Sequence, residues 1–127
     1  KAAVEDAYLN DYDLTYDQYH LLIYLSFSKT PPTISEISKK YNRAQNTISE
    51  KISRLEEKEL VSRIDDSMDR RITRVIITEK GLNLINTIRQ ERSNRVTYIA
   101  LKKMNNREVE NLLTNLTKLY NNLNKED

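Results

Sequence analysis

Residues 43–78 have the sequence RAQNTISEKISRLEEKELVSRIDDSMDRRITRVIIT, and this stretch decides the fold. Its first part carries apolar residues at intervals of 4, 4 and 3 positions, the spacing of one face of an α-helix: Ala44, Ile48, Ile52 and Leu55. Two β-branched runs follow at residues 60–64 and 72–78, on either side of the polar residues 65–71. Such runs are typical of a two-stranded hairpin with a charged tip. The stretch therefore predicts a helix over about 43–58 and then a β-hairpin.

Capping patterns on both sides of this stretch mark the starts of further helices. Each places a side-chain acceptor three residues before Glu or Gln, so that the two side chains satisfy free backbone N–H groups of the first turn. The pairs are Thr15 with Gln18, Thr33 with Glu36, Asn42 with Gln45, and Asn105 with Glu108. Thr78 before Glu79 is a simpler start. The apolar spacing then predicts the order helix, helix, short helix, helix, hairpin, long helix, helix.

This order is the plan of a winged helix-turn-helix with additional helices at both ends. We therefore predict a mainly α fold with a small β-hairpin wing, in a single domain of residues 1–127. The winged helix part covers about residues 15–78, and helices at residues 1–14 and 79–127 flank it.

The composition disfavours several other classes of protein. There is no cysteine and a single histidine, His20, with no carboxylates near it at ligand spacing, so no metal or other cofactor is expected. One glycine cannot make a glycine-rich phosphate loop, and no nucleophile stands beside a base, which argues against an enzyme. No apolar run approaches the ~18 residues of a membrane span, and no signal peptide is visible. These features predict a cytoplasmic protein without a membrane partner.

The formal net charge of +2 is unevenly distributed along the chain. Residues 1–38 carry two basic and six acidic side chains, whereas residues 39–74 carry ten basic and seven acidic ones. A cationic middle favours an anionic partner. The alternative is a solvated surface whose charge asymmetry arose by chance.

The face of the predicted helix opposite its apolar stripe carries side chains that hydrogen-bond to base edges or phosphates in a major groove of double-stranded DNA. These side chains are Gln45, Asn46, Thr47, Ser49, Lys51 and Arg54. A polar helix face is also common on any solvated surface. Its place as the second helix of a helix-turn-helix, before a basic hairpin, favours the DNA interpretation.

The predicted hairpin tip carries Arg70 and Arg71, and Arg74 lies on the strand that follows. A narrow minor groove concentrates negative potential, and an arginine on a stiff ribbon reaches into it. Asp69 stands two residues before Arg71, where its carboxylate can hold the guanidinium through a bidentate pair. The alternative is an ordinary charged turn.

Four segments resemble, in the same order, the MarR family of winged helix-turn-helix transcription regulators. Residues 14–18 (LTYDQ) are similar to the family's helix entry, and residues 47–49 (TIS) leading to 55–61 (LEEKELV) are similar to its recognition helix and exit. Residues 66–71 (DSMDRR) resemble its wing, and residues 77–81 (ITEKG) its strand-to-helix junction. The resemblance covers most of the chain.

This resemblance implies a homodimeric repressor on a pseudo-palindromic operator, with the recognition helices in successive major grooves and the wings in flanking minor grooves. It places Gln45, Asn46, Thr47 and Ser49 at the base-reading positions, Lys51 and Arg54 nearer the backbone, and Arg71 at the wing, steadied by Asp69. Residues 1–14 and 79–127 would form the dimer. In agreement, the last helix has more apolar surface than one small domain needs: Leu112, Leu116, Leu119 and Leu123.

The resemblance further implies release by a small aromatic effector. The candidate contacts are Tyr16, Tyr19, His20 and Tyr24, although tyrosines at helical spacing are otherwise core or interface residues. The chain departs from the family at Glu59, where glycine is frequent because a left-handed conformation is easiest for glycine. A glutamate there either costs about 1 kcal/mol or indicates a different helix exit. It also departs at Met68, where many relatives carry a basic residue.

A different class of function remains open at this point: a winged helix that binds another protein and does not contact DNA. Such a module requires an apolar patch where the polar recognition face is predicted.

Overall fold

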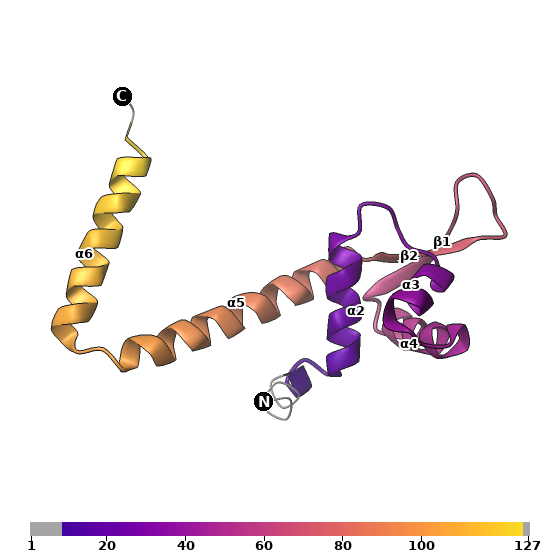
Figure 1. The fold of residues 1–127 in the computed structure, drawn as a ribbon, viewed down its shortest axis with the longest axis horizontal. Helices are drawn as coiled ribbons and strands as arrows, with labels where there is room; N and C mark the ends of the chain where they lie inside the picture. Colours follow the sequence, from indigo (N-terminus) through magenta and orange to yellow (C-terminus); the bar gives the residue numbers. More distant parts are fainter. Residues whose placement is uncertain (1–8, 126–127) are drawn as a thin grey trace. The chain divides into compact units, whose positions relative to one another are not determined.

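The computed structural model describes residues 9–125 and confirms the mainly α winged helix-turn-helix (Figure 1). The elements are α2 (Tyr16–Phe27), α3 (Ile34–Tyr41), α4 (Gln45–Glu57), β1 (Val61–Asp65), β2 (Thr73–Ile77), α5 (Glu79–Lys102) and α6 (Asn106–Leu123). The helix predicted before residue 15 falls largely on residues 1–8, outside the described residues. The chain forms two compact units, divided after Thr87 within α5.

Local capping explains where three of the helices begin. The Thr15 hydroxyl accepts from the Gln18 N–H, and the Gln18 carboxamide accepts from the Thr15 N–H, both at 3.1 Å. Asn105 and Glu108 form the same reciprocal pair at the start of α6. The Thr33 hydroxyl accepts from the Glu36 N–H at the start of α3. These three predicted starts are confirmed.

The predicted pair of Asn42 with Gln45 is wrong. Asn42 has a φ of 51° and ends α3 in the left-handed conformation, and its N–H donates to the carbonyls of Ser38 and Lys39. Ala44 is the cap residue of α4, and no side-chain hydrogen bond caps this helix. Ala44 is also exposed, so it does not belong to the buried stripe that the sequence predicted. The turn between the two helices is too short for both ends to be capped independently. Asparagine tolerates the left-handed conformation and is therefore used to end α3.

The hairpin and α4 enclose the core of the first unit. β1 and β2 are antiparallel, in a register from Val61 opposite Ile77 to Asp65 opposite Thr73. The loop after α2 joins this ribbon, because the Pro32 carbonyl accepts from the Val75 N–H at 2.9 Å. Helices α2, α3 and α5 also contribute to this core, and the fully buried apolar side chains of the first unit include Leu22, Ile37, Ile52, Leu55, Val61, Val75 and Ile85.

The exit of α4 is tightly built against the start of α5. Glu59 has a φ of 63°, so the helix exit is left-handed although glutamate stands where glycine is frequent in the family, and a different exit is not used. The Thr78 hydroxyl donates to the Glu59 carbonyl at 2.7 Å and accepts from the Gly81 N–H at 3.0 Å. A Cβ atom on Gly81 would lie 2.4 Å from the Leu60 carbonyl oxygen. Only glycine therefore lets the first turn of α5 approach this carbonyl.

We predict that Gly81→Ala lowers the free energy of unfolding by about 1–3 kcal/mol, because overpacking against backbone outweighs the helix propensity of alanine. Asn83→Ala, at an exposed position of the same helix, serves as the control and should change stability by less than about 0.5 kcal/mol. Urea denaturation of both variants provides the measurement. Unchanged stability of Gly81→Ala would contradict the close approach.

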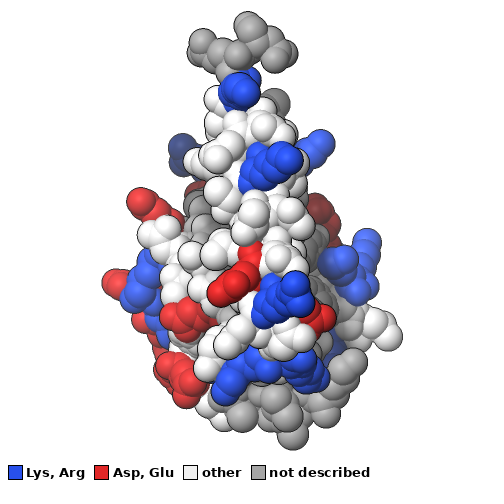
Figure 2. All heavy atoms as spheres, turned by 90° about the vertical axis from the view of Figure 1, so that its left-hand side faces the viewer, with Lys and Arg blue, Asp and Glu red and all other residues white. Residues whose placement is uncertain are grey.

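The second unit comprises residues from Ile88 onward, including α6. None of the described residues of α6 is buried, although its apolar side chains recur at helical spacing. Leu112, Leu116, Leu119 and Leu123 are between 39% and 75% exposed. Figure 2 shows Lys and Arg side chains, together with Asp and Glu side chains, set among uncharged residues on the face that it draws. Among the helices described, none combines the length and apolar character needed to cross a membrane.

Candidate nucleic-acid interface

Helix α4 is seated by its apolar face and leaves a polar face exposed. Ile48, Ile52 and Leu55 are between 0% and 3% exposed. Exposed residues from the predicted recognition set lie outside this stripe. They are Asn46, Thr47 and Arg54 on the other side of the helix, and Gln45 at its N-terminal end. The Asn46 carboxamide oxygen accepts from the Thr47 N–H at 2.9 Å, which leaves the amide NH₂ group of Asn46 outside this bond. The exposed surface is therefore hydrogen-bonding and not apolar.

Two of the predicted recognition residues are half-buried and already have partners inside the protein. The Ser49 hydroxyl accepts from the Arg63 guanidinium at 3.0 Å. The Lys51 ammonium donates to the Asp17 carboxylate at 2.9 Å. The exposed recognition face is consequently narrower than the sequence predicted.

Arg63, on β1, ties the hairpin to α4 and was not among the residues predicted from the sequence. Its guanidinium donates to the Glu56 carboxylate at 2.6 Å, to the Ser49 carbonyl at 2.9 Å and to the Ser53 hydroxyl at 3.2 Å, besides the bond to the Ser49 hydroxyl. The Arg63 N–H also donates to Glu56. The sequence contains a pattern that could have indicated this contact. Ser49, Ser53 and Glu56 are spaced 4 and 3 residues apart, so their side chains line one face of the helix and can share one cation.

The base of the wing is closed by Asp66. One oxygen of its carboxylate accepts from the Met68 and Asp69 N–H groups at 3.0 Å, and the other accepts from Arg74 Nε at 2.6 Å. These hydrogen bonds, the one from Arg74 first, lower the pKa of Asp66 below its ordinary value. The loop is thus held by a carboxylate that stays ionised.

Arg74 lies within this network, whereas the sequence placed it among the DNA contacts. Its guanidinium also donates to the Pro31 carbonyl at 2.7 Å and lies 3.9 Å from the Glu36 carboxylate. The side chain is 23% exposed. A DNA contact by Arg74 stays a prediction, and its guanidinium now has internal acceptors that compete for it.

Arg71 and Asp69 form the pair expected at the wing tip. Arg71 Nε and one terminal nitrogen donate to the two oxygens of Asp69 at 3.0 and 2.9 Å. The Arg71 side chain is 90% exposed. The bidentate bond lowers the pKa of Asp69 and raises the pKa of Arg71, so both groups stay charged. Arg70 is exposed beside them. The tip therefore projects a guanidinium in a fixed pose.

Comparison with known proteins agrees with this geometry. The family described as "Winged helix DNA-binding domain" matches residues 14–81, more than half of the chain. The chain belongs to this family. The match spans α2 to the start of α5 and therefore includes the recognition helix and the wing.

Solved structures of MarR-type regulators share the fold. A mutant of Staphylococcus aureus MepR bound to an oligodeoxyribonucleotide is 28% identical, with a TM-score of 0.72, covering 93% of this chain and 86% of that one. A mutant MarR from Escherichia coli has a TM-score of 0.67 at 22% identity, with coverage of 93% and 86%. The predicted resemblance to MarR-family regulators is confirmed.

A curated relative is similar over part of its length. The HTH-type transcriptional regulator YsmB of Bacillus subtilis (strain 168) is 34% identical over 80 residues, which is 63% of this chain. The matched stretch spans 54% of the length of that relative.

The tyrosine-rich helix of this winged helix protein does not form one aromatic pocket. The rings of Tyr16 and Tyr19 lie 4.2 and 6.2 Å from that of His20, whereas Tyr24 pairs with Tyr41 at 6.0 Å. Tyr16 is 42% exposed and Tyr19 is buried. The candidate effector residues are thus divided between two clusters, and an effector contact by them stays a prediction.

We predict that Arg63→Met destabilises the winged helix domain by about 2–3 kcal/mol, because it removes charge-assisted hydrogen bonds to α4 and leaves Glu56 without its cation. Arg70→Met makes the same chemical change at an exposed wing position, and should alter stability by less than about 0.5 kcal/mol. Thermal and urea unfolding measure both variants. Equal stability of the two variants would mean that Arg63 does not hold α4 to the hairpin.

Proposed function

We propose that this chain is a sequence-specific, DNA-binding transcription regulator that acts as a homodimeric repressor on a pseudo-palindromic operator in the cytoplasm. The observation that carries the proposal is the pairing of a polar recognition face on α4 with an exposed, carboxylate-held arginine on the wing. The MepR complex with an oligodeoxyribonucleotide supports DNA as the partner.

The recognition helix would enter a major groove. Gln45, Asn46 and Thr47 occupy its first turn and are exposed. Amide and hydroxyl side chains supply both donors and acceptors, and the pattern of donors and acceptors in the major groove distinguishes all four base pairs. Asn46 keeps its NH₂ donors outside the bond to Thr47, so it suits an acceptor such as N7 of a purine.

The wing would enter the adjacent minor groove. Arg71 is held by Asp69 through Nε and one terminal nitrogen, which leaves the other terminal nitrogen to donate to base edges or phosphates. The guanidinium is already ordered, so binding costs less side-chain entropy than it would for an unpaired arginine. This arrangement suits a groove read by shape and potential.

A winged helix that binds another protein is less well supported. That function needs an apolar patch on the exposed side of α4. The exposed side of α4 instead carries Asn46, Thr47 and Arg54, with Gln45 exposed at the N-terminal end of the helix. DNA retardation assays distinguish the two functions, because a protein-binding module would retard no duplex even at low salt.

We predict different effects from changes in the wing and in the recognition helix. Arg71→Ala should weaken binding to all duplexes and reduce the salt slope by about 1, because a phosphate-proximal cation is lost. Asn46→Ala should instead change base preference, with about 1–3 kcal/mol of discrimination lost at one base pair. Lys118→Ala removes a charge from α6 as the control.

The measurement is selection of DNA fragments by the purified protein, followed by titration of selected and scrambled duplexes over a range of salt. An equal loss on every sequence for both Arg71→Ala and Asn46→Ala would contradict this division of roles.

The dimer is proposed to form through the second unit. Its exposed apolar residues on α6 make a stripe at intervals of 4, 3 and 4 positions: Leu112, Leu116, Leu119 and Leu123. Contiguous apolar surface of this kind marks an association site in a protein of this size. A symmetric pair buries the same stripe on both copies.

We predict that Leu116→Asp with Leu119→Asp converts the dimer to a monomer, because two carboxylates cannot be buried in an apolar interface without large cost. Asn115→Asp with Asn121→Asp adds the same charge to the same helix at polar positions and should leave the dimer intact. Sedimentation velocity at one protein concentration measures both. A wild-type chain that sediments as a monomer would contradict the proposed assembly.

Release by a small aromatic effector is a separate proposal, based on the family resemblance. Salicylate serves as the probe: a lowered operator affinity together with a raised melting temperature would support it, and no change in either would remove such compounds as effectors.

A further inference from the structure

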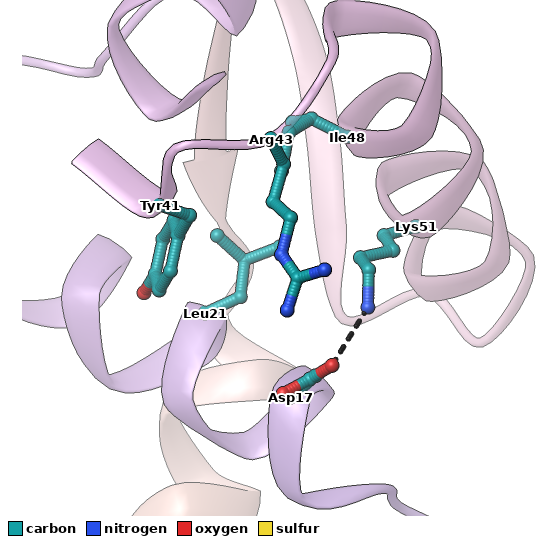
Figure 3. A pocket seen from close by; sticks show the side chains of 6 residues that line it. All are labelled: Asp17, Leu21, Tyr41, Arg43, Ile48 and Lys51. Carbon is teal, nitrogen blue, oxygen red and sulfur yellow. Dashed lines mark hydrogen bonds and ion pairs between the residues drawn. The ribbon is translucent and has the colours of Figure 1, made fainter. Parts of the chain in front are cut away.

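A small pocket lies between α2, the turn after α3, and α4 (Figure 3). Its lining is formed by Asp17, Leu21, Tyr41, Arg43, Ile48 and Lys51. Leu21 and Ile48 are the buried apolar residues of this lining, and in Figure 3 the guanidinium of Arg43 and the ammonium of Lys51 point towards the carboxylate of Asp17. The Tyr41 hydroxyl donates to the His20 carbonyl at 3.3 Å, and burial raises the pKa of Tyr41, so this phenol stays neutral.

The charges in this pocket do not balance. One carboxylate, Asp17, faces two cations, and its contact drawn in Figure 3 is with Lys51 at 2.9 Å. The guanidinium of Arg43 points into the same space in Figure 3. The hydrogen bond from Lys51 lowers the pKa of the Asp17 carboxyl, and the positive charge of Arg43 also lowers it, through a coulombic interaction and not a hydrogen bond. The carboxylate is therefore ionised, and the pocket carries one excess positive charge.

We propose that Arg43 and Lys51 bind a phosphodiester of the DNA backbone, and that Asp17 occupies this site in the free protein as an internal competitor. The inference rests on the proposed function and deepens it. Lys51 lies on the recognition helix, and Arg43 lies two residues before that helix begins. A backbone phosphate beside an inserted α4 would meet both cations together.

In the free protein, among the residues that the structure describes, the two cations are not both paired. The carboxylate of Asp17 engages Lys51, whereas a phosphodiester placed between the two cations can accept from the guanidinium and the ammonium at once. The N-terminus of α4 carries the positive end of the helix dipole, which attracts an anion. No acidic side chain in the first turn of α4 offsets this attraction.

This competition has a defined consequence for DNA binding. Since every duplex offers phosphates, breaking the pair of Asp17 and Lys51 opposes binding to all sequences alike. Asp17 would thereby lower overall affinity without changing base preference. A purely structural role, in which the ion pair only joins α2 to α4, makes the opposite prediction, because its loss would loosen α4 and weaken binding.

The test compares Asp17→Asn with Asp11→Asn in the full chain. Asp11 is exposed and outside the pocket, so the control removes the same charge. We expect Asp17→Asn to bind both a selected operator duplex and a scrambled duplex about two- to fivefold more tightly, as expected for loss of an exposed ion pair. The salt slope should become steeper, because the displaced carboxylate of the wild-type protein takes up a cation from solution on binding and the carboxamide of the variant does not. The control should reproduce neither change.

Variants of the cations complete the design. In a Lys51→Met, Arg43→Gln background, Asp17→Asn should give no gain over the control. The proposal is overturned if Asp17→Asn binds no more tightly than the control, or if its gain survives without the two cations. Inorganic phosphate at matched ionic strength should raise the melting temperature no more than chloride does. A rise that depends on Arg43 would assign the site to a free anion and overturn the backbone assignment.

Failure of the proposed function is distinguishable from these outcomes. If the wild-type chain retards no duplex at low salt, the regulator assignment is wrong. If the wild-type chain binds and Asp17→Asn gives no gain, the inference about the pocket alone is wrong.

Discussion

The seating of α4 on the hairpin is the constraint on which the rest of the structure depends. Burial of Ile48, Ile52 and Leu55 contributes about 1.5–3 kcal/mol for each side chain. Apolar burial is non-directional, so by itself it tolerates small rotations of the helix about its axis. The hydrogen bonds of Arg63 to Ser49 and Glu56 are directional and act on the flank of the same helix. Together they fix which side chains face outward.

Interactions between residues close together in the sequence were predicted, whereas interactions between residues far apart in the sequence were not. Helix starts at Thr15 and Asn105 were predicted because their partners lie three residues away. The bond of Lys51 to Asp17 and the bond of Arg74 to the Pro31 carbonyl were not predicted, because they span 34 and 43 residues. The bond of Arg74 to Asp66 spans only 8 residues, but it crosses the hairpin and depends on the strand register, and it was not predicted either. No periodicity in the sequence encodes which distant carboxylate or carbonyl a cation will meet.

The error at Asn42 has a different origin. Both the end of α3 and the start of α4 could use this residue, and local patterns do not decide between them. At Glu59 the family resemblance left two outcomes open, a left-handed residue or a different helix exit, and the structure has the left-handed residue. In both places the deciding factor is a backbone conformation, and glycine is absent from both, so the sequence carries no strong marker of it.

Asp69 and Asp17 each pair with a cation that we propose contacts DNA, and they differ in how many of that cation's hydrogen-bond donors they use. Asp69 takes Nε and one terminal nitrogen of Arg71, and a guanidinium retains further donors in the same plane. Asp69 therefore orients Arg71 without blocking it. Asp17 pairs with a compact ammonium that is only 31% exposed, so a phosphate must displace the carboxylate or share a small charge with it. In the proposed complex the same type of ion pair thus supports binding at the wing and opposes it beside the recognition helix, because arginine and lysine present their donors differently.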